Sequence, residues 1–451
     1  MAFSFNTEDV LAQIQTALEK SDLNSAIQYL EQLRAQDQAD VFYDLDDEEK
    51  IALLARLDPA TSADILEGLS SEEEAAELLR ALPTATVIRI IEEMAPDEAA
   101  DLLGDIDPDV AQAILARLEH PEEIQPLLLH PDDSAGGLMT SEFLALRQRM
   151  TASDALQAVR QWKPESETAY YLYVVDAQKK LVGVVSLLQL IVADPLTLLK
   201  DILDPDVISV PAGTDQEEVA HLIAHYDLLS LPVVDENRVL LGVITIDDVM
   251  DVIEDEATED IQRMGGAQPL DQPYLSTRVW TISRKRIGWL LLLFLTESLT
   301  GTVLRHFQGE LQSVVALAFF VPLLIGTGGN AGSQVTSTII RALAVGDIDL
   351  GDAMKALWHE LRVGIALGAG MAVIAYLRAL TWGSTPGLAL TVSTAIFVIV
   401  VWANGLGAIL PVLAARLHID PTVVSGPVMS TLVDATGLFI YFSVARLFLR
   451  M

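Results

Sequence analysis

Hydrophobic positions recur at a fixed interval along the first part of the chain. Leucine, isoleucine or methionine returns every 12 or 13 residues, at Leu57, Leu69, Leu82, Met94, Ile106 and Leu118. In four of these units a proline follows the apolar residue directly or one residue later, and proline suits the first turn of a helix. Each unit therefore predicts one short helix, and their succession predicts an acidic α-solenoid over residues 1–132.

A longer repeat follows the solenoid. YVVDAQKKLVGVVSLLQL (173–190) matches PVVDENRVLLGVITIDDV (232–249) at a constant offset of 59 residues. Strand-length apolar runs alternate with helical patterns in each copy, which predicts helix, strand, turn, strand, helix. Residues 133–255 thus predict an α/β tandem, with copies at about 137–200 and 201–255. The repeat resembles a tandem CBS pair, a regulatory module that commonly binds adenine nucleotides between its halves.

The last third of the sequence is mostly apolar. Five apolar segments can be drawn, at 287–307, 312–343, 354–380, 386–416 and 421–448. Each is long enough to cross a hydrocarbon core of about 30 Å. We expect the second and fourth to be tilted or broken, and the stretch Gly326–Gly332 predicts a break inside the second. Residues 284–451 thus predict an all-α domain of five transmembrane helices, and residues 256–283 a connecting helix.

Charge separates the two parts of the protein. The formal net charge of −36 divides into −40 over residues 1–275 and +4 over residues 276–451. An acidic surface attracts cations and repels nucleic acid. The basic residues near the apolar segments favour a cytoplasmic position for the N-terminal domains.

The absence of cysteine excludes thiolate metal sites. The N-terminus lacks a basic region followed by an apolar run, so no cleaved signal peptide is predicted.

Only two carboxylates lie deep in the apolar segments, Glu297 and Asp434. A charge in hydrocarbon is costly and marks a partner, water or an ion. Asp434 stands among small and hydroxyl residues in SGPVMSTLVDATG, where Pro427 predicts a freed backbone carbonyl one turn upstream. An all-oxygen lining suits a hard cation and disfavours zinc or copper. Asn330 and Gln334 are predicted to line the same pore, with a small-residue packing seam as the alternative reading of their segment.

GTGGNAGSQ, GPVMSTLVDATG and the order of the domains resemble the MgtE family of magnesium channels. The resemblance implies a multi-pass homodimer in the plasma (inner) membrane, with a Mg²⁺-selective pore on the two-fold axis. Asp434 of both subunits would hold a hydrated Mg²⁺ ion there, beside Ser430 and Gly426. Many family members have asparagine at the position of Gly426, so the lower filter of this chain is expected to select less sharply.

The resemblance further implies that cytosolic Mg²⁺ closes the channel by bridging acidic residues of the soluble domains. The matching positions are Asp64, Asp97, Asp101, Asp215, Glu217, Asp227, Asp248, Asp251, Glu256, Glu259 and Asp260. Without ions the like charges repel and the domains separate, whereas with Mg²⁺ the connecting helix blocks the pore. The alternative for each of these acids is plain solvated surface.

A nucleotide site is a further expectation. In CBS pairs an acidic residue that opens the last helix often holds a ribose, and Asp248 matches that position. The first copy has Gln189 there, which predicts one ATP site at most. The alternative role of Asp248 is helix capping.

Two rival functions stay open. A proton- or sodium-coupled divalent-cation carrier would use Glu297 or Asp434 as its coupling site. A CBS-regulated membrane enzyme is disfavoured, because the apolar part carries neither a nucleophile and base at a catalytic spacing nor a phosphate loop. The sequence therefore predicts a protein that is not an enzyme.

Overall fold

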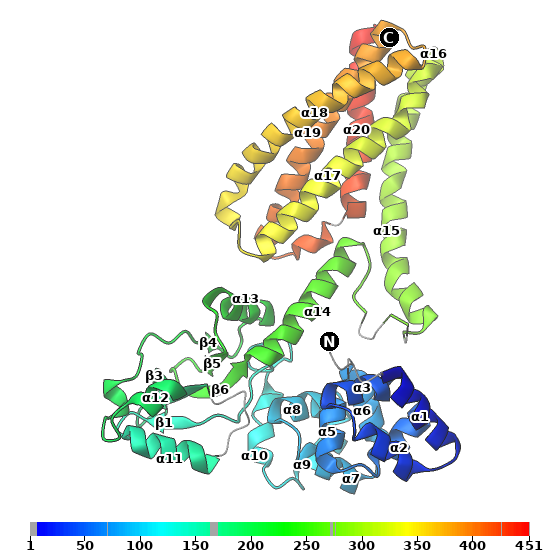
Figure 1. Cartoon of the computed structure of the whole chain (residues 1–451). Coiled ribbons are helices and arrows are strands. Elements are labelled where there is room, and N and C mark those ends of the chain that lie inside the picture. The colour runs from blue at the N-terminus through cyan, green and yellow to red at the C-terminus, as the bar shows by residue number, and fades with distance from the viewer. Residues whose placement is uncertain are drawn as a thin grey trace. The chain divides into compact units, whose positions relative to one another are not determined.

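The computed structural model describes residues 7–69, 71–162, 170–270, 274–275, 277–424 and 426–450. They form two compact units, Met1–Glu254 and Asp255–Met451 (Figure 1). The first unit combines a helical solenoid with two small sheets, and the second is helical. The predicted fold class is confirmed in both units.

The solenoid consists of short helices joined by tight turns. They are α1 (Thr7–Glu19), α2 (Leu23–Leu30), α3 (Ala35–Tyr43), α4 (Asp47–Leu54), α5 (Pro59–Glu67), α6 (Glu72–Ala81), α7 (Thr84–Ile91), α8 (Pro96–Gly104), α9 (Pro108–Leu115), α10 (Pro121–Ile124) and the 3₁₀ turn η1 (Leu127–Leu129). Proline opens α5, α8 and α9, as the sequence predicts. The recurring residues, such as Leu57 and Met94, are buried in one continuous core.

The two α/β copies have the same topology. In the first, β1 (Ala145–Arg147) pairs parallel with β2 (Tyr171–Val175), which pairs antiparallel with β3 (Leu181–Ser186). In the second, β4 (Val210–Pro211), β5 (Ser230–Val234) and β6 (Leu240–Thr245) repeat this order. Tyr173 opposes Val184 in one hairpin and Pro232 opposes Val243 in the other. The two hairpins thus have the same pairing, and equivalent residues are 59 positions apart, as in the sequence repeat.

Helices flank each sheet. The first copy contributes α11 (Ala152–Trp162), α12 (Leu187–Val192) and the turn η2 (Leu199–Asp201), and the second contributes α13 (Gln216–Tyr226) and α14 (Ile246–Met264). Helix α14 follows β6 directly, so the acidic helix begins inside the second copy and continues to Met264. Its start therefore precedes the predicted connecting segment.

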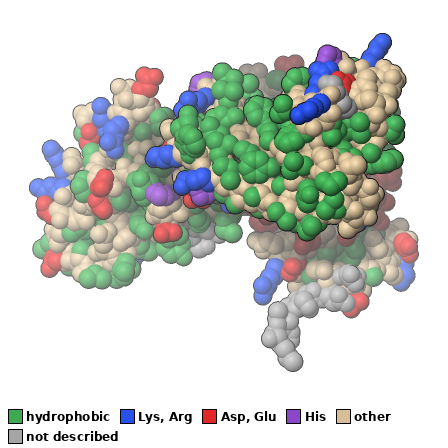
Figure 2. All heavy atoms as spheres, turned by 90° about the horizontal axis from the view of Figure 1, so that it is seen from above, with side chains coloured by type: hydrophobic (Ala, Val, Ile, Leu, Met, Phe, Trp, Pro, Cys, Tyr) green, Lys and Arg blue, Asp and Glu red, His purple; other side chains and the backbone are tan. Residues whose placement is uncertain are grey.

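The second unit holds five helices that are long and apolar enough to span a membrane. Its elements after α14 are α15 (Val279–His306), α16 (Gln308–Ser313), η3 (Val315–Phe320), α17 (Val321–Ala344), η4 (Leu350–Asp352), α18 (Ala353–Thr381), α19 (Pro386–Arg416), η5 (Pro421–Val423) and α20 (Gly426–Leu449). Helix α19 packs against α17, α18 and α20, and half of its apolar window is buried, against 6% for α15. Hydrophobic side chains cover a broad field of the visible surface (Figure 2).

Two local expectations about these helices are wrong, those for the glycine stretch of α17 and for Pro427. The stretch Gly326–Gly332 remains regular helix within α17, and the second apolar segment is interrupted earlier, at η3. The fourth segment, expected to be tilted or broken, runs unbroken as α19 although Pro411 lies inside it. Pro427 falls in the first turn of α20. Backbone N–H groups in a first turn have no intrahelical acceptor, so proline removes no helical hydrogen bond there. It therefore frees no carbonyl inside the span.

Candidate pore and cation-sensing sites

Asp434 continues a polar line along α20. Gly426, Ser430 and Asp434 are spaced four residues apart, which places them on one face of the helix, and all three are half-buried. Among the described residues, the Asp434 carboxylate makes no hydrogen bond and no ion pair. This line therefore presents the Asp434 carboxylate, the Ser430 hydroxyl and the Gly426 backbone as oxygen groups that could contact an ion.

Helix α17 lies close against this line because its glycines have no side chains. The Ser333 hydroxyl donates to the Gly426 carbonyl at 3.2 Å and lies 3.5 Å from the Ser430 hydroxyl. A Cβ on Gly329 would lie 3.1 Å from the Ser430 oxygen, and one on Gly332 would lie 2.8 Å from Met429. The packing-seam alternative for the glycine stretch is therefore confirmed.

Replacing Gly328 by alanine should destabilise the membrane part. The added Cβ would lie 2.6 Å from a methyl of Ile399 and 2.8 Å from one of Val433, an overlap that typically costs about 1–3 kcal/mol. Gly326→Ala is the matched control, because nothing lies within 4 Å of a Cβ there. Thermal unfolding in detergent should show a lower midpoint for Gly328→Ala alone. Equal midpoints for both variants would contradict this packing.

The other predicted groups of the membrane part lie elsewhere. Asn330 and Gln334 share an exposed face of α17, beside the glycine face that packs on α20. No hydrogen bond between described residues joins either of them to Asp434. Glu297 is exposed on α15, which packs along α20, and its carboxylate interacts electrostatically with Asp434. Glu297 thus lies within electrostatic range of the pore line.

A group of carboxylates gathers inside the first unit. Asp97 is buried in the first turn of α8, and its pKa is raised by burial and by Asp247 on α14. Burial together with Asp97, Glu67, Asp101 and Asp248 raises the pKa of Glu98 to about 9. Burial and Asp97 raise the pKa of Asp248 to about 7. A cation entering this group would displace protons and relieve the repulsion.

Two buried oxygens of this group have no partner. Oδ1 of Asp97 and Oδ1 of Asp247 are buried without a hydrogen bond in the described structure. Native proteins rarely leave such atoms unsatisfied, and a water or an ion is a common explanation. Sequence reasoning named Asp97, Asp101 and Asp248 but missed Glu67, Glu98 and Asp247. Glu98 and Asp247 adjoin named residues, so their proximity was the available signal.

The remaining predicted sensors of the first unit lie on its surface. Asp64, Asp215, Glu217, Asp227 and Asp251 are exposed. Asp215 caps α13 by accepting the Glu217 N–H at 2.9 Å, and Asp227 ends the same helix in a left-handed conformation. Burial and neighbouring acids raise the pKa of Asp251. The structure thus brings Asp97, Asp101 and Asp248 together and leaves these five outside that group.

A second acidic group surrounds Arg263 near the end of α14. The Arg263 guanidinium pairs with Glu259 and, at 2.5 Å, with Asp420 of η5. Partial burial raises the pKa of Glu259, as do Glu256 and Asp420, while Arg263 lowers it. Burial, Asp420 and Glu256 likewise raise the pKa of Asp260. Asp420 was missed because it stands far away in the sequence, in a loop between spans.

Neither acidic group has the geometry of a preformed metal-binding site. No set of three or more His, Asp or Glu side chains among the described residues is arranged to hold an ion. Asp248 also has a local structural task, since its carboxylate accepts from the Thr245 hydroxyl at 2.6 Å. It also accepts from the Thr245 N–H at 3.4 Å, as Gln189 in the first copy accepts from the Ser186 N–H at 2.8 Å. The capping role of Asp248 is therefore confirmed.

Family models match about three quarters of the chain. The divalent cation transporter model MgtE matches residues 321–444, and the MgtE intracellular N domain matches residues 33–133. The CBS domain model matches residues 135–195 and 199–255. Together with five apolar helices, these matches define a multi-pass membrane protein of the divalent-cation-transporter class with an N-terminal soluble region.

Known proteins agree with that class. The magnesium transporter MgtE of Thermus thermophilus is 46% identical over 73% of this chain and 73% of its own length. The magnesium transporter MgtE of Bacillus subtilis is 35% identical over 72% of each chain. The crystal structure of the cytosolic domain of the Mg²⁺ channel MgtE in complex with ATP covers 54% of this chain and 99% of its own, with 41% identity and a TM-score of 0.51. The chain belongs to the MgtE magnesium transporter family.

Proposed function

We propose that this protein is a Mg²⁺-selective channel of the plasma membrane, built as a homodimer and closed by cytosolic Mg²⁺. The observation that carries the proposal is Asp434, whose carboxylate has no hydrogen bond or ion pair among the described residues, on the polar line of α20 within an apolar span. Mg²⁺ sheds its water reluctantly, so a carboxylate from each subunit suits a hydrated ion. Relatives named magnesium transporters support Mg²⁺ as the cargo.

The dimer is supported by what a single chain leaves uncovered. Asp434 faces no described counter-charge, and one carboxylate alone does not neutralise a dication. Leu290, Phe294 and Leu295 of α15 are more than half exposed, which lipid or a second copy would cover. A two-fold axis beside α20 would bring two Asp434 carboxylates to one ion.

Gating by cytosolic Mg²⁺ is supported by the two acidic groups. One joins the solenoid helix α8 to the second CBS copy through Asp97 and Asp248. The other joins the end of α14 to Asp420, between the last two spans. Both hold carboxylates whose pKa values are raised by burial and by neighbouring acids. Mg²⁺ bound in these places would draw the elements together and fix α14.

Reconstitution of the full chain in liposomes tests the function. Mg²⁺ entry should be measured with a trapped indicator, with pH and sodium equal on both sides. Flux under these conditions supports a channel. Flux that requires a proton or sodium gradient would instead establish a coupled carrier, for which Glu297 beside Asp434 is the specific observation.

ATP should bind at the CBS pair with one nucleotide per chain. A related cytosolic domain has been crystallised with ATP, and this chain offers Asp248 in one copy and Gln189 in the other. Asp248→Asn should lower ATP affinity about tenfold, the effect of losing one charge-assisted hydrogen bond. Gln189→Ala is the matched control and should leave the affinity unchanged. Isothermal titration with two equivalent nucleotides per chain would contradict the asymmetry.

A further inference from the structure

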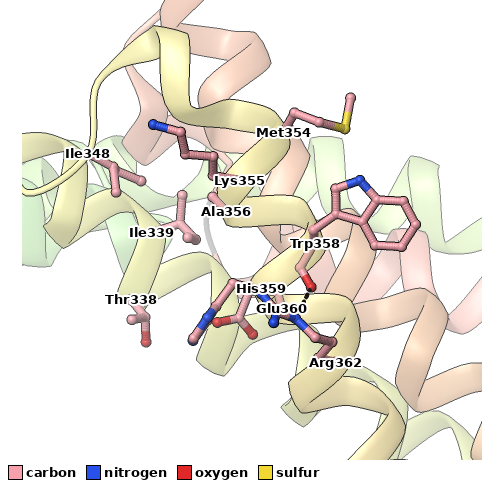
Figure 3. A pocket seen from close by; sticks show the side chains of 10 residues that line it. All are labelled: Thr338, Ile339, Ile348, Met354, Lys355, Ala356, Trp358, His359, Glu360 and Arg362. Atoms are coloured by element: carbon pink, nitrogen blue, oxygen red, sulfur yellow. Dashed lines mark hydrogen bonds between the residues drawn. The ribbon is translucent and has the colours of Figure 1, made fainter.

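A groove separates the first turns of α18 from the end of α17 (Figure 3). Its volume is about 750 Å³, and it belongs entirely to the second unit. Its walls are Thr338, Ile339, Ile348, Met354, Lys355, Ala356, Trp358, His359, Glu360 and Arg362. Neither the pore line of α20 nor the acidic groups contribute to it.

The rim of the groove carries basic side chains. Lys355, His359 and Arg362 follow one another at intervals of four and three residues, so they are neighbours along α18. Lys355 pairs with Asp352 at 2.6 Å but is 85% exposed at its side chain, which leaves donors open to solvent. In the described structure no carboxylate pairs with His359 or Arg362, and the Arg362 Nε donates only to the Trp358 carbonyl.

Glu360, the carboxylate among the described lining residues, has a partner inside the protein. Glu360 accepts from the Asn404 amide at 3.4 Å, and Asn404 is fully buried in α19. A Cβ on Gly364, one turn further along α18, would touch the Asn404 side chain at 3.1 Å, so this contact is tight. Glu360 therefore faces inward, while the Lys355 ammonium, paired with Asp352, and the exposed Arg362 guanidinium stay accessible at the rim.

The surroundings of the groove are those of a membrane interface. It occupies the start of the candidate span Leu350–Thr381, on the side that the basic residues predict to be cytoplasmic. Met354 and Trp358 are 59% and 60% exposed, and Ile339 and Ile348 pack in the core behind them. Tryptophan and basic residues together are typical of the headgroup level. Basic pockets between spans on the cytoplasmic side suit anionic lipid headgroups.

We propose that this groove binds an anionic phospholipid. Lys355, His359 and Arg362 hold the headgroup phosphate, and Met354 with Trp358 contacts the acyl chain. The lipid joins α18 to the loop after α17, and its site is separate from ion conduction. The accessible cationic donors of Lys355 and Arg362 favour a phosphate diester, and the exposed apolar side chains favour a lipid over a free anion.

Native mass spectrometry of the full chain, extracted from bilayers of equal phosphatidylglycerol and phosphatidylcholine, tests the proposal. The wild type should retain phosphatidylglycerol preferentially. Lys355→Gln with Arg362→Gln should reduce this retention about 25-fold, since each basic residue near a membrane surface contributes about fivefold. Lys355→Arg with Arg362→Lys should keep most of it, because the charge is preserved.

The matched control is Arg378→Gln with Arg305→Gln, which removes two charges where α18 ends and α15 ends. Arg378 lies over the Trp382 ring at 4.7 Å, away from the groove. This control should retain phosphatidylglycerol like the wild type. Equal loss in both double variants would overturn the site, as would equal retention of the two lipids by the wild type.

Two further outcomes would replace the proposal. If inorganic phosphate displaces the lipid at equal concentration, the groove is a site for soluble anions. If the groove variant changes the oligomeric state in detergent, measured by light scattering, the groove is an interface between copies. A wild-type oligomer together with selective loss of phosphatidylglycerol supports the lipid site.

Discussion

Replacing Asp434 by asparagine should abolish Mg²⁺ flux while the protein still assembles. The carboxylate is half-buried and unpaired among the described residues, so the folded chain loses no partner with the charge. A hydrogen bond to a charged group contributes about 1.5–3 kcal/mol. With one such group from each subunit, the loss of ion stabilisation corresponds to a fall in flux of about 100-fold or more.

Glu297→Gln is the matched control for that experiment. It removes the same charge from a neighbouring span that packs on α20, and Glu297 is exposed rather than part of the polar line. A channel with Asp434 as its ion ligand should keep flux within about twofold. Flux of purified protein in liposomes decides the matter. Normal flux through Asp434→Asn would refute its role, and flux lost only in Glu297→Gln would point to a coupled carrier.

The sequence predicted the elements well wherever a repeat or a long apolar run carried the signal. Prolines at the starts of α5, α8 and α9 and the constant offset between the two hairpins are local patterns, and the structure follows them. The glycine stretch of α17 was misread because glycine serves two purposes. It can break a helix, or it can let two helices approach closely. Gly328 packs against Ile399 and Val433, so here glycine allows close approach of helices. This role is visible only in the packed structure.

The acidic sites were predicted in part for a similar reason. Family resemblance supplied Asp97 and Asp248, but burial and neighbouring acids also raise the pKa of Glu98 to about 9, a residue that no local pattern distinguishes from other glutamates. Asp420 meets α14 through Arg263, and this pairing spans more than 150 positions. Such groups depend on how distant elements meet. Sequence periodicity predicts each helix but does not predict which distant helices and loops contact one another.

Neutralising Asp97, Asp101 and Glu259 together should leave conduction intact and weaken closure by cytosolic Mg²⁺. The three residues belong to the two acidic groups, and none lies on the pore line of α20. Moving a gate from mostly open to mostly closed takes about 5.5 kcal/mol, and one bridging ion typically couples two sites by about 1–3 kcal/mol. Loss of one or two bridges should therefore raise the half-inhibiting Mg²⁺ concentration roughly tenfold or more.

The control must change the charge equally without touching either group. Asp40, Asp47 and Glu48 are exposed acids of the same solenoid, and their neutralisation should leave the Mg²⁺ response unchanged. Open probability against cytosolic Mg²⁺ in excised patches compares wild type, triple variant and control. Identical curves for all three would assign these acids to solvated surface. If the control shifts as far as the triple variant, overall charge sets the response. A shift in the triple variant alone means that Mg²⁺ acts at the two groups, where burial and neighbouring acids raise carboxylate pKa values and a dication can relieve the repulsion.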